Sequence, residues 1–165
     1  MDPRLREDDV TLLHCHPFCN SLESGDMFFR ESDREHHMIS HVYIGITDFD
    51  RALLFYSAVM ADLDLQLKFA EPAKHWAGWV SRTQARPLFL IGLPFDGQPH
   101  APGNGQMAAL LAPSRAAVDK AHATALAHGA RNEGAPGLRP HYHQHYYGAY
   151  FRDPDGNKLC ICCHD

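Results

Sequence analysis

The chain lacks an apolar run of the roughly 18 residues that a membrane-spanning helix needs, so we do not expect a membrane protein. Its first ten residues, MDPRLREDDV, contain no apolar core of a secretory signal. An excess of positive charge is also missing, because the formal net charge is −5, and this argues against a nucleic-acid partner. Five cysteines without a signal predict free thiols in a reducing, cytoplasmic compartment and no disulfide framework.

What is present is typical of one globular domain: 165 residues, 45% of them apolar and 21% charged. The charge imbalance lies in residues 1–37, which carry nine acidic and four basic side chains and show no regular apolar period. We therefore expect 1–37 to be a disordered or non-native extension, with Met38 as the native start. His14, Cys15, His16 and Cys19 could ligate zinc, but their spacing matches no standard finger.

Residues 38–92 predict a strand, a helix and three strands. Residues 39–46 alternate and are apolar on both faces, which predicts a strand buried on both sides. Apolar side chains then recur at helical spacing from Phe49 to Leu63, behind Thr47 and Asp48 as possible caps. Residues 65–69, 76–81 and 87–91 are short apolar segments separated by proline, glycine and polar residues, as expected for strands.

The same order recurs in residues 105–165. Residues 106–112 predict a strand, Ser114 a helix N-cap, and Gly129 the residue that follows the helix. Weak strand character in 130–133 is followed by strands at 146–152 and 158–163. The Asp-Pro-Asp-Gly-Asn segment 153–157 joins the last two as a tight turn. The sequence thus predicts two βαβββ modules, about 38–92 and 105–165.

Three segments within 38–164 resemble the vicinal oxygen chelate superfamily of glyoxalases, bleomycin-resistance proteins and extradiol dioxygenases. They are ISHVYIGITDFDRALLFYSAVM, APSRAAVDKAHATALAHGA and YYGAYFRDPDGNKLCICC, of which the RDPDGN turn is the most specific. The resemblance implies an α+β fold in which the two modules form a partly open, eight-stranded barrel around a cup. It also implies a homodimer and a small-molecule ligand.

The resemblance further implies a divalent metal ion held by side chains of the first and last strands of the modules. His41 matches the first-strand ligand, but Cys160 stands where the family has a glutamate, Met107 where it often has a histidine, and Phe89 or Leu90 at the fourth position. A thiolate and an imidazole suit zinc or copper, so His41 and Cys160, with Cys162 on the same strand face, are candidate zinc ligands. The alternative is a hydrogen-bonded interior His41 beside cysteines that only fill the core, without a metal.

Other side chains are candidates for a ligand pocket. His141, His143 and His145 would share one face if their segment is extended, and His141, His143 and Tyr146 could orient a substrate or move a proton. A surface loop is the alternative reading of that segment. A nucleophilic Cys160 activated by His41 is also conceivable. The candidate pocket comprises His41, Tyr43, Trp79, Met107, His141, His143, Tyr146, Cys160 and Cys162, while catalytic residues stay unassigned.

Two functions remain open from the sequence. The first is a glyoxalase-like enzyme, a lyase, isomerase or dioxygenase with a reduced ligand set, in which a metal stabilises negative charge on the substrate. The missing glutamate at position 160 argues against lactoylglutathione lyase activity itself. The second is a metal-free binding protein of the bleomycin-resistance type, which sequesters a drug or metabolite in an apolar cup.

Overall fold

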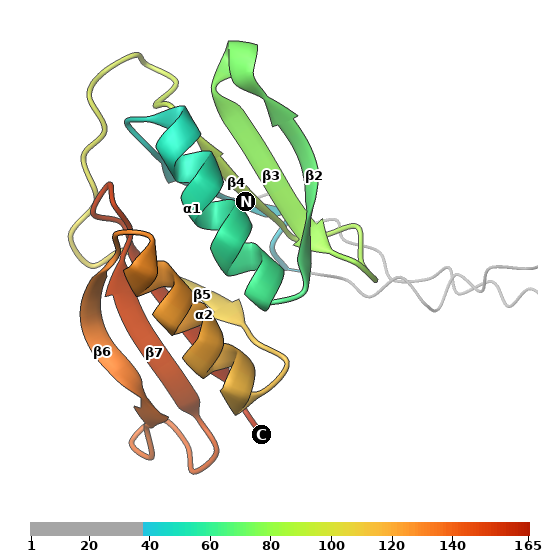
Figure 1. Ribbon diagram of the computed structural model, residues 1–165, viewed down its shortest axis with the longest axis vertical. Coiled ribbons are helices and arrows are strands. Elements are labelled where there is room, and N and C mark those ends of the chain that lie inside the picture. The colour runs from blue at the N-terminus through green and yellow to red at the C-terminus, as the bar shows by residue number, and fades with distance from the viewer. Residues whose placement is uncertain (1–37) are drawn as a thin grey trace, which may run out of the picture. The chain divides into compact units, whose positions relative to one another are not determined.

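A computed structural model describes residues 38–165, so the predictions for 1–37 lie outside the described residues. The first module contains β1 (His41–Gly45), α1 (Phe49–Asp62), β2 (Leu65–Glu71), the short 3-10 helix η2 (Pro72–Lys74), β3 (Trp76–Ser81) and β4 (Leu88–Gly92). The second contains β5 (Ala108–Leu111), α2 (Arg115–Ala127), β6 (Arg131–Leu138), β7 (Tyr147–Arg152) and β8 (Lys158–Cys163). The two predicted βαβββ modules are therefore confirmed (Figure 1).

Each module forms its own four-stranded mixed sheet, in the order β1-β4-β3-β2 or β5-β8-β7-β6. In both sheets the first strand is parallel to the last strand of its module, and the other pairs are antiparallel. The eight strands are not closed into one barrel. Since β1 and β5 are edge strands, one side of each is left without a hydrogen-bonded neighbour in its sheet.

The edge position of β1 corrects one expectation. We predicted a strand buried on both sides, but His41 and Tyr43 are exposed while Val42 and Ile44 are partly buried. The apolar alternation was correct for the face that packs on the core, where Ile44 contacts the main cluster. The opposite face, which carries His41 and Tyr43, is covered only in part.

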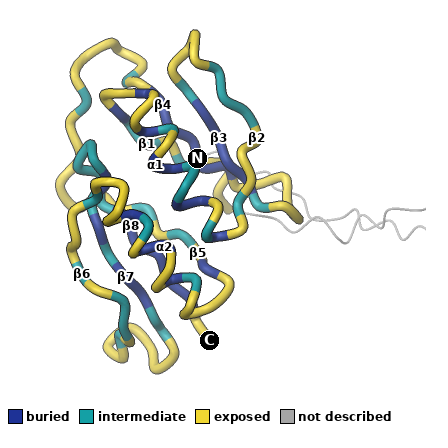
Figure 2. Tube along the Cα trace, in the orientation of Figure 1, coloured by how far each residue is buried: buried dark blue, intermediate teal, exposed yellow. Residues whose placement is uncertain are grey.

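The main core fills the space between the two helices and the sheets. Phe55 and Tyr56 from α1 pack with their rings 5.0 Å apart, and Phe55 lies 6.2 Å from Phe151 of β7. Ala121 and Ala125 of α2 are completely buried. Figure 2 shows the resulting pattern, in which the inner strands are buried and the connecting loops are exposed. This shared core holds the two modules together.

Local sequence explains where the helices begin and end. The Asp48 and Ser114 side chains accept hydrogen bonds from the backbone N–H groups of Arg51 and Ala117, which would otherwise lack partners in the first turn. Gly129 follows α2 with a φ of +95°, a conformation that glycine adopts without strain. Among the described residues, no helix is long and apolar enough to cross a membrane.

The Asp-Pro-Asp-Gly-Asn turn between β7 and β8 connects the two modules. Its buried Asp153 accepts a 2.6 Å hydrogen bond from the Tyr56 hydroxyl of α1. Asn157 Nδ2 donates to the Gly45 carbonyl at 2.8 Å, and Arg51 pairs with Asp155 at 2.7 Å. The turn therefore fixes the end of β1 and the start of α1 against the second module.

Candidate functional site

An open cavity of about 430 Å³ lies between the edge strands β1 and β5. Apolar groups dominate its wall, and the polar side chains come from Tyr43, Gln106, Asn157 and Lys158. The full lining comprises Ile39, Val42, Tyr43, Ile44, Phe89, Pro102, Gly103, Gln106, Met107, Ala108, Ala109, Leu110, Asn157 and Lys158. Both modules contribute to this wall, so the packing that joins them also creates the cavity.

Two paired glycines leave room for two rings at the ends of β1 and β4. Gly45 of β1 is in register with Gly92 of β4. A Cβ on Gly92 would lie 2.1 Å from the Tyr43 hydroxyl oxygen, and one on Gly45 would lie 2.4 Å from Nδ1 of His100. Glycine at both positions thus leaves space for the Tyr43 phenol and the His100 imidazole. These two rings cover the ends of β1 and β4.

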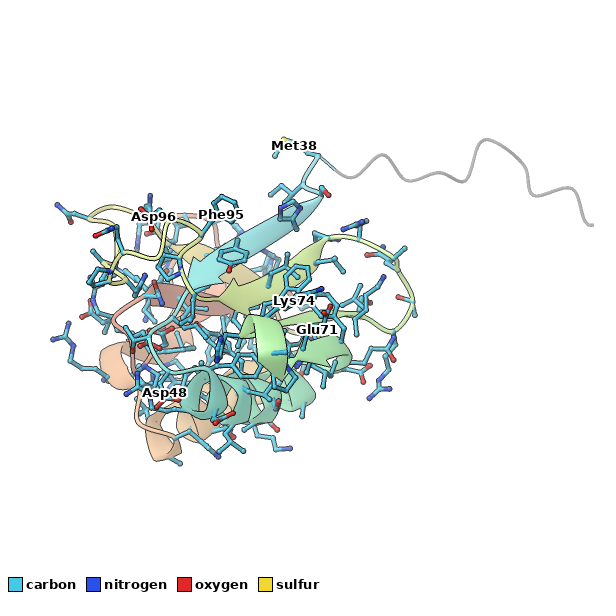
Figure 3. All side chains as sticks on the ribbon, turned by 90° about the horizontal axis from the view of Figure 1, so that it is seen from above. Met38, Asp48, Glu71, Lys74, Phe95 and Asp96 are labelled. Carbon is cyan, nitrogen blue, oxygen red and sulfur yellow. The ribbon has the colours of Figure 1, made fainter. Side chains whose placement is uncertain are left out.

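Hydrogen bonding orients the Tyr43 side chain on the cavity wall. Its hydroxyl donates to the Leu93 carbonyl at 2.9 Å, across the end of β4. Burial raises the pKa of Tyr43, so the phenol stays protonated and acts as a donor at neutral pH. In Figure 3, Phe95 and Asp96 of the following loop lie with Met38 on the side of the sheets away from the helices.

Lys158 is the only charged side chain among the residues that line this cavity. Gln106 adds an amide, and Asn157 has its Nδ2 already donating to the Gly45 and Asp153 oxygens. These polar residues were absent from the predicted pocket. Asn157 and Lys158 follow the glycine of the recognised turn, and only the packing of that turn on β1 places them at the cavity.

Tyr43 and Met107 are the predicted pocket residues that line the cavity. His41 is exposed at the start of β1, where its Nδ1 lies 3.3 Å from the Ser40 hydroxyl. Trp79 is 1% exposed and belongs to the main core, with its ring 6.1 Å from that of Tyr56. Trp79 therefore packs toward α1.

Four of the remaining predicted residues gather around β8, together with His164. Cys160 and Cys162 are buried on this strand, and the Tyr146 hydroxyl oxygen lies 3.4 Å from Cys160 Sγ. His143 Nε2 lies 2.7 Å from Nδ1 of His164. This group, which we call the thiol cluster, comprises Tyr146, Cys160, Cys162, His143 and His164. None of its members lines the cavity described above.

The histidine-rich segment is not extended, so the condition for a shared face is not met. Backbone hydrogen bonds from Tyr142 to Arg139 and from Tyr146 to His143 fold it into consecutive turns. His143 consequently reaches His164, whereas His145 contacts Gln144 and His141 packs 4.3 Å from the Tyr142 ring. Turn-forming backbone bonds, which the residue pattern does not specify, separate the three imidazoles.

The donor set does not fit the divalent metal ion that the resemblance implies. His41 pairs with Leu88 in one sheet, whereas Cys160 pairs with Ala109 and Tyr150 in the other. The remaining two family positions carry the thioether of Met107 and an apolar side chain, which are poor ligands for a hard cation. Within residues 38–165 no three His, Cys, Asp or Glu side chains are grouped as metal ligands.

Comparison with known proteins identifies the family. The model of the Glyoxalase/Bleomycin resistance protein/Dioxygenase superfamily matches residues 38–161. The chain belongs to this superfamily. It is 34% identical to a glyoxalase/bleomycin resistance protein from Albidiferax ferrireducens T118, with a TM-score of 0.70, and the alignment covers 77% of this chain and 99% of that one.

More distant solved structures share the fold. A glyoxalase/bleomycin resistance protein/dioxygenase family enzyme from Burkholderia phytofirmans PsJN is 21% identical, with a TM-score of 0.58 and coverage of 76% of this chain and 98% of that one. A lactoylglutathione lyase from Agrobacterium tumefaciens is 22% identical, with a TM-score of 0.52 and coverage of 76% and 92%. A search of curated proteins gave no significant match.

Proposed function

We propose that this protein binds a small molecule in the cavity between β1 and β5 without a metal ion. The observation that carries the proposal is the composition of the wall: its residues include no carboxylate, imidazole or thiol. Metal-assisted chemistry requires such ligands, whereas a mostly apolar wall with a few polar groups is typical of a ligand-binding pocket. The name of the relative from Albidiferax ferrireducens, a glyoxalase/bleomycin resistance protein, is compatible with a binding role.

The wall also indicates the class of ligand. Ile39, Val42 and Met107 offer an apolar surface, and Phe89 offers an aromatic ring. Lys158 is the one cation of the wall, and no acidic side chain of the wall neutralises it. A flat apolar compound with one anionic group therefore complements the cavity, with its anion near the Lys158 ammonium.

Fluorescence titration with 8-anilinonaphthalene-1-sulfonate, a flat apolar anion, tests this proposal. We expect saturable binding at one site per chain. Lys158→Met should weaken it at least roughly tenfold, because a hydrogen bond to a charged group contributes about 1.5–3 kcal/mol net. Met107→Trp should abolish it by filling the cavity. Binding that both substitutions leave unchanged would contradict the proposal.

Two controls separate a specific site from general surface binding. Lys68→Met removes an exposed lysine of β2 that lies outside the cavity wall, and it should leave the titration unchanged. The uncharged analogue N-phenyl-1-naphthylamine should bind equally to the parent protein and to Lys158→Met. Circular dichroism of each variant confirms that it is folded.

A metal-assisted lyase or isomerase is the competing function, and His41 with Cys160 would be its ligands. Elemental analysis of the purified protein distinguishes the two functions. One zinc per chain that is lost in Cys160→Ser would support the enzyme and contradict our proposal.

We also expect a homodimer, and sedimentation at twice the 18.5 kDa chain mass would support that expectation, whereas a monomer would contradict it.

A further inference from the structure

The second sheet carries a tyrosine on the face that points away from the main core. Tyr150 of β7 is in register with Cys160 of β8 and with Gly134 of β6. Its neighbours along the strand, Ala149 and Phe151, belong to the main core cluster, so alternation places Tyr150 on the opposite face. Because the Tyr150 ring is only partly buried, side chains that contact it there lie within reach of a ligand.

Two cations approach the Tyr150 ring from opposite ends of the sheet. Lys158 of β8 is in register with Arg152, at the end of β7 that leads into the turn. Arg139 follows β6 beyond the partner of Tyr147, which begins β7 at the other end. Cζ of Arg139 lies 5.5 Å from the centre of the Tyr150 ring, and Nζ of Lys158 lies 6.0 Å from it. The two charges therefore cannot be farther apart than the sum of these distances.

Glycines and backbone carbonyls hold the Arg139 guanidinium in place. A Cβ on Gly137 would lie 3.0 Å from Nη1, and one on Gly134 would lie 3.7 Å from Nη2, so the guanidinium lies over these two glycines of β6. Nη1 donates to the Leu138 carbonyl at 3.1 Å, and Nη2 donates to the Ala135 carbonyl at 2.7 Å. These two bonds use only part of the donor capacity of a guanidinium, so N–H groups remain for a ligand. An arginine fixed in this way loses little conformational freedom when it binds an anion.

Neither cation forms an ion pair with a carboxylate of residues 38–165. Glu133 is the only acidic side chain of the strands β6, β7 and β8. Its carboxylate already accepts hydrogen bonds from Arg131 at 2.8 Å and from Arg152 at 3.1 Å. The positive charges of Arg139 and Lys158 are therefore available to an anionic ligand.

Tyrosine rings beside the two cations favour an aromatic ligand. The Tyr150 hydroxyl interacts with those of Tyr142 and Tyr146. The rings of Tyr142 and Tyr146 lie 5.1 Å apart, and Tyr142 is 62% exposed. Exposed tyrosine rings offer a flat apolar surface, and a guanidinium itself stacks on aromatic groups. A planar compound with an anionic group at each end complements this arrangement.

We propose that Arg139 and Lys158 form a two-point binding site for a planar aromatic dianion that lies across Tyr150. One carboxylate of the ligand pairs with the guanidinium through two parallel hydrogen bonds, and the other accepts from the Lys158 ammonium. Arg139 is absent from the wall of the cavity between β1 and β5, whereas Lys158 borders both sites. The dianion site thus extends beyond the proposed function and does not rest on it.

Calorimetric titration of the full-length protein with three benzene carboxylates tests this proposal. Terephthalate carries its two carboxylates at opposite ends of the ring, phthalate carries the same charge on adjacent carbons, and benzoate has one carboxylate. Only terephthalate can reach both cations, so we expect it to bind roughly fivefold to tenfold more tightly than either of the others. The titration is done at low ionic strength, because salt screens partly exposed charges.

Substitution of each cation assigns the preference to the site. Arg139→Met and Lys158→Met should each lower the affinity for terephthalate to that for benzoate. Arg139→Lys keeps the charge but loses the paired donors, so it should keep only part of the preference. Lys68→Met is the control, because it removes an exposed lysine from β2 in the other sheet and should change nothing.

Two results would overturn the proposal. The first is equal affinity of the parent protein for terephthalate and phthalate, because a general attraction for anions does not distinguish them. The second is a terephthalate preference that persists in both Arg139→Met and Lys158→Met. The comparison of ligands on the parent protein does not depend on whether any variant folds.

One pair of variants separates this proposal from the proposed function. Arg139→Met should leave the titration with 8-anilinonaphthalene-1-sulfonate unchanged, because Arg139 does not line the cavity. Met107→Trp, which fills the cavity, should leave the terephthalate preference intact. Failure of either proposal therefore shows itself in a different titration.

Discussion

Removal of one hydroxyl tests whether the turn between β7 and β8 stabilises the contact between the two modules. The Tyr56 hydroxyl donates to Asp153 Oδ2 at 2.6 Å, and both side chains are almost fully buried. Tyr56→Phe keeps the ring contacts with Phe55, Trp79 and Phe89. The substitution thus removes a hydrogen bond to a buried carboxylate without creating a large void.

The structure gives the size of the expected effect. A hydrogen bond to a charged group contributes about 1.5–3 kcal/mol, and here the acceptor cannot turn to water instead. Asp153 retains three other donors: the backbone N–H groups of Asp155 and Asn157 and the Asn157 amide. We therefore expect the free energy of unfolding to fall by about 2 kcal/mol and the melting temperature by about 5–10 °C.

The same substitution should have a pH dependence of known sign. Burial raises the pKa of Asp153, and the hydrogen bonds from Tyr56 and Asn157 oppose that rise. Because the pKa of Asp153 is raised in the folded state, the protonated carboxyl favours the folded state. This contribution to stability is complete below the unfolded pKa and is lost as the pH rises through the folded pKa. Removing the phenol raises the folded pKa further, so Tyr56→Phe should be most destabilising near neutral pH.

Urea denaturation at pH 7 and pH 4 measures both effects. Tyr147→Phe is the matched control, because the Tyr147 hydroxyl donates to Asp119 at 2.7 Å on an exposed part of α2. That surface contact should contribute less than about 1 kcal/mol. The reasoning would be refuted if the two variants were equally stable at pH 7, or if the deficit of Tyr56→Phe grew as the pH fell.

Two further substitutions test the packing of the helices and of the cavity wall. Burial acts to raise the pKa of Asp62, but hydrogen bonds from Lys120 and Thr124 outweigh it and hold the pKa below its usual value. The stability that this carboxylate contributes is therefore present above its unfolded pKa and is lost as the pH falls through its folded pKa. Asp62→Asn should therefore reduce stability at pH 7 and lose this deficit near pH 3 in urea denaturation; a deficit of constant size would contradict the assignment. Gly92→Ala should displace the Tyr43 hydroxyl and break its hydrogen bond to the Leu93 carbonyl, and because this exposed side chain can move aside we expect a loss of only about 0.5–1.5 kcal/mol in the same assay. An unchanged stability would show that the hydrogen bond contributes nothing.

Local patterns predicted most of the secondary structure because they depend on neighbouring residues. The caps Asp48 and Ser114, Gly129 after α2 and the 153–157 turn were all identified from residue type and position. The strand predicted at 130–133 is longer in the structure, Arg131–Leu138, and includes Pro136. β6 is an edge strand, where a proline that cannot donate a hydrogen bond is tolerated.

Features that depend on contacts far along the chain could not be predicted in this way. Tyr56 fits the apolar stripe of α1, and nothing near it in sequence indicates that its hydroxyl meets Asp153, 97 residues later. The exposure of His41 and Tyr43 depends on which face of the first sheet the helices cover, and only the long-range packing of the chain decides this. The place of Lys158 on the cavity wall depends in the same way on how the turn packs on β1.

A crystal structure with 8-anilinonaphthalene-1-sulfonate bound is the most direct test of the binding function. We expect the aromatic rings between β1 and β5, against Met107 and Phe89, with the sulfonate oxygens within hydrogen-bond distance of the Lys158 ammonium. The same probe bound only outside this cavity, or a metal ion coordinated by His41 and Cys160, would contradict the account.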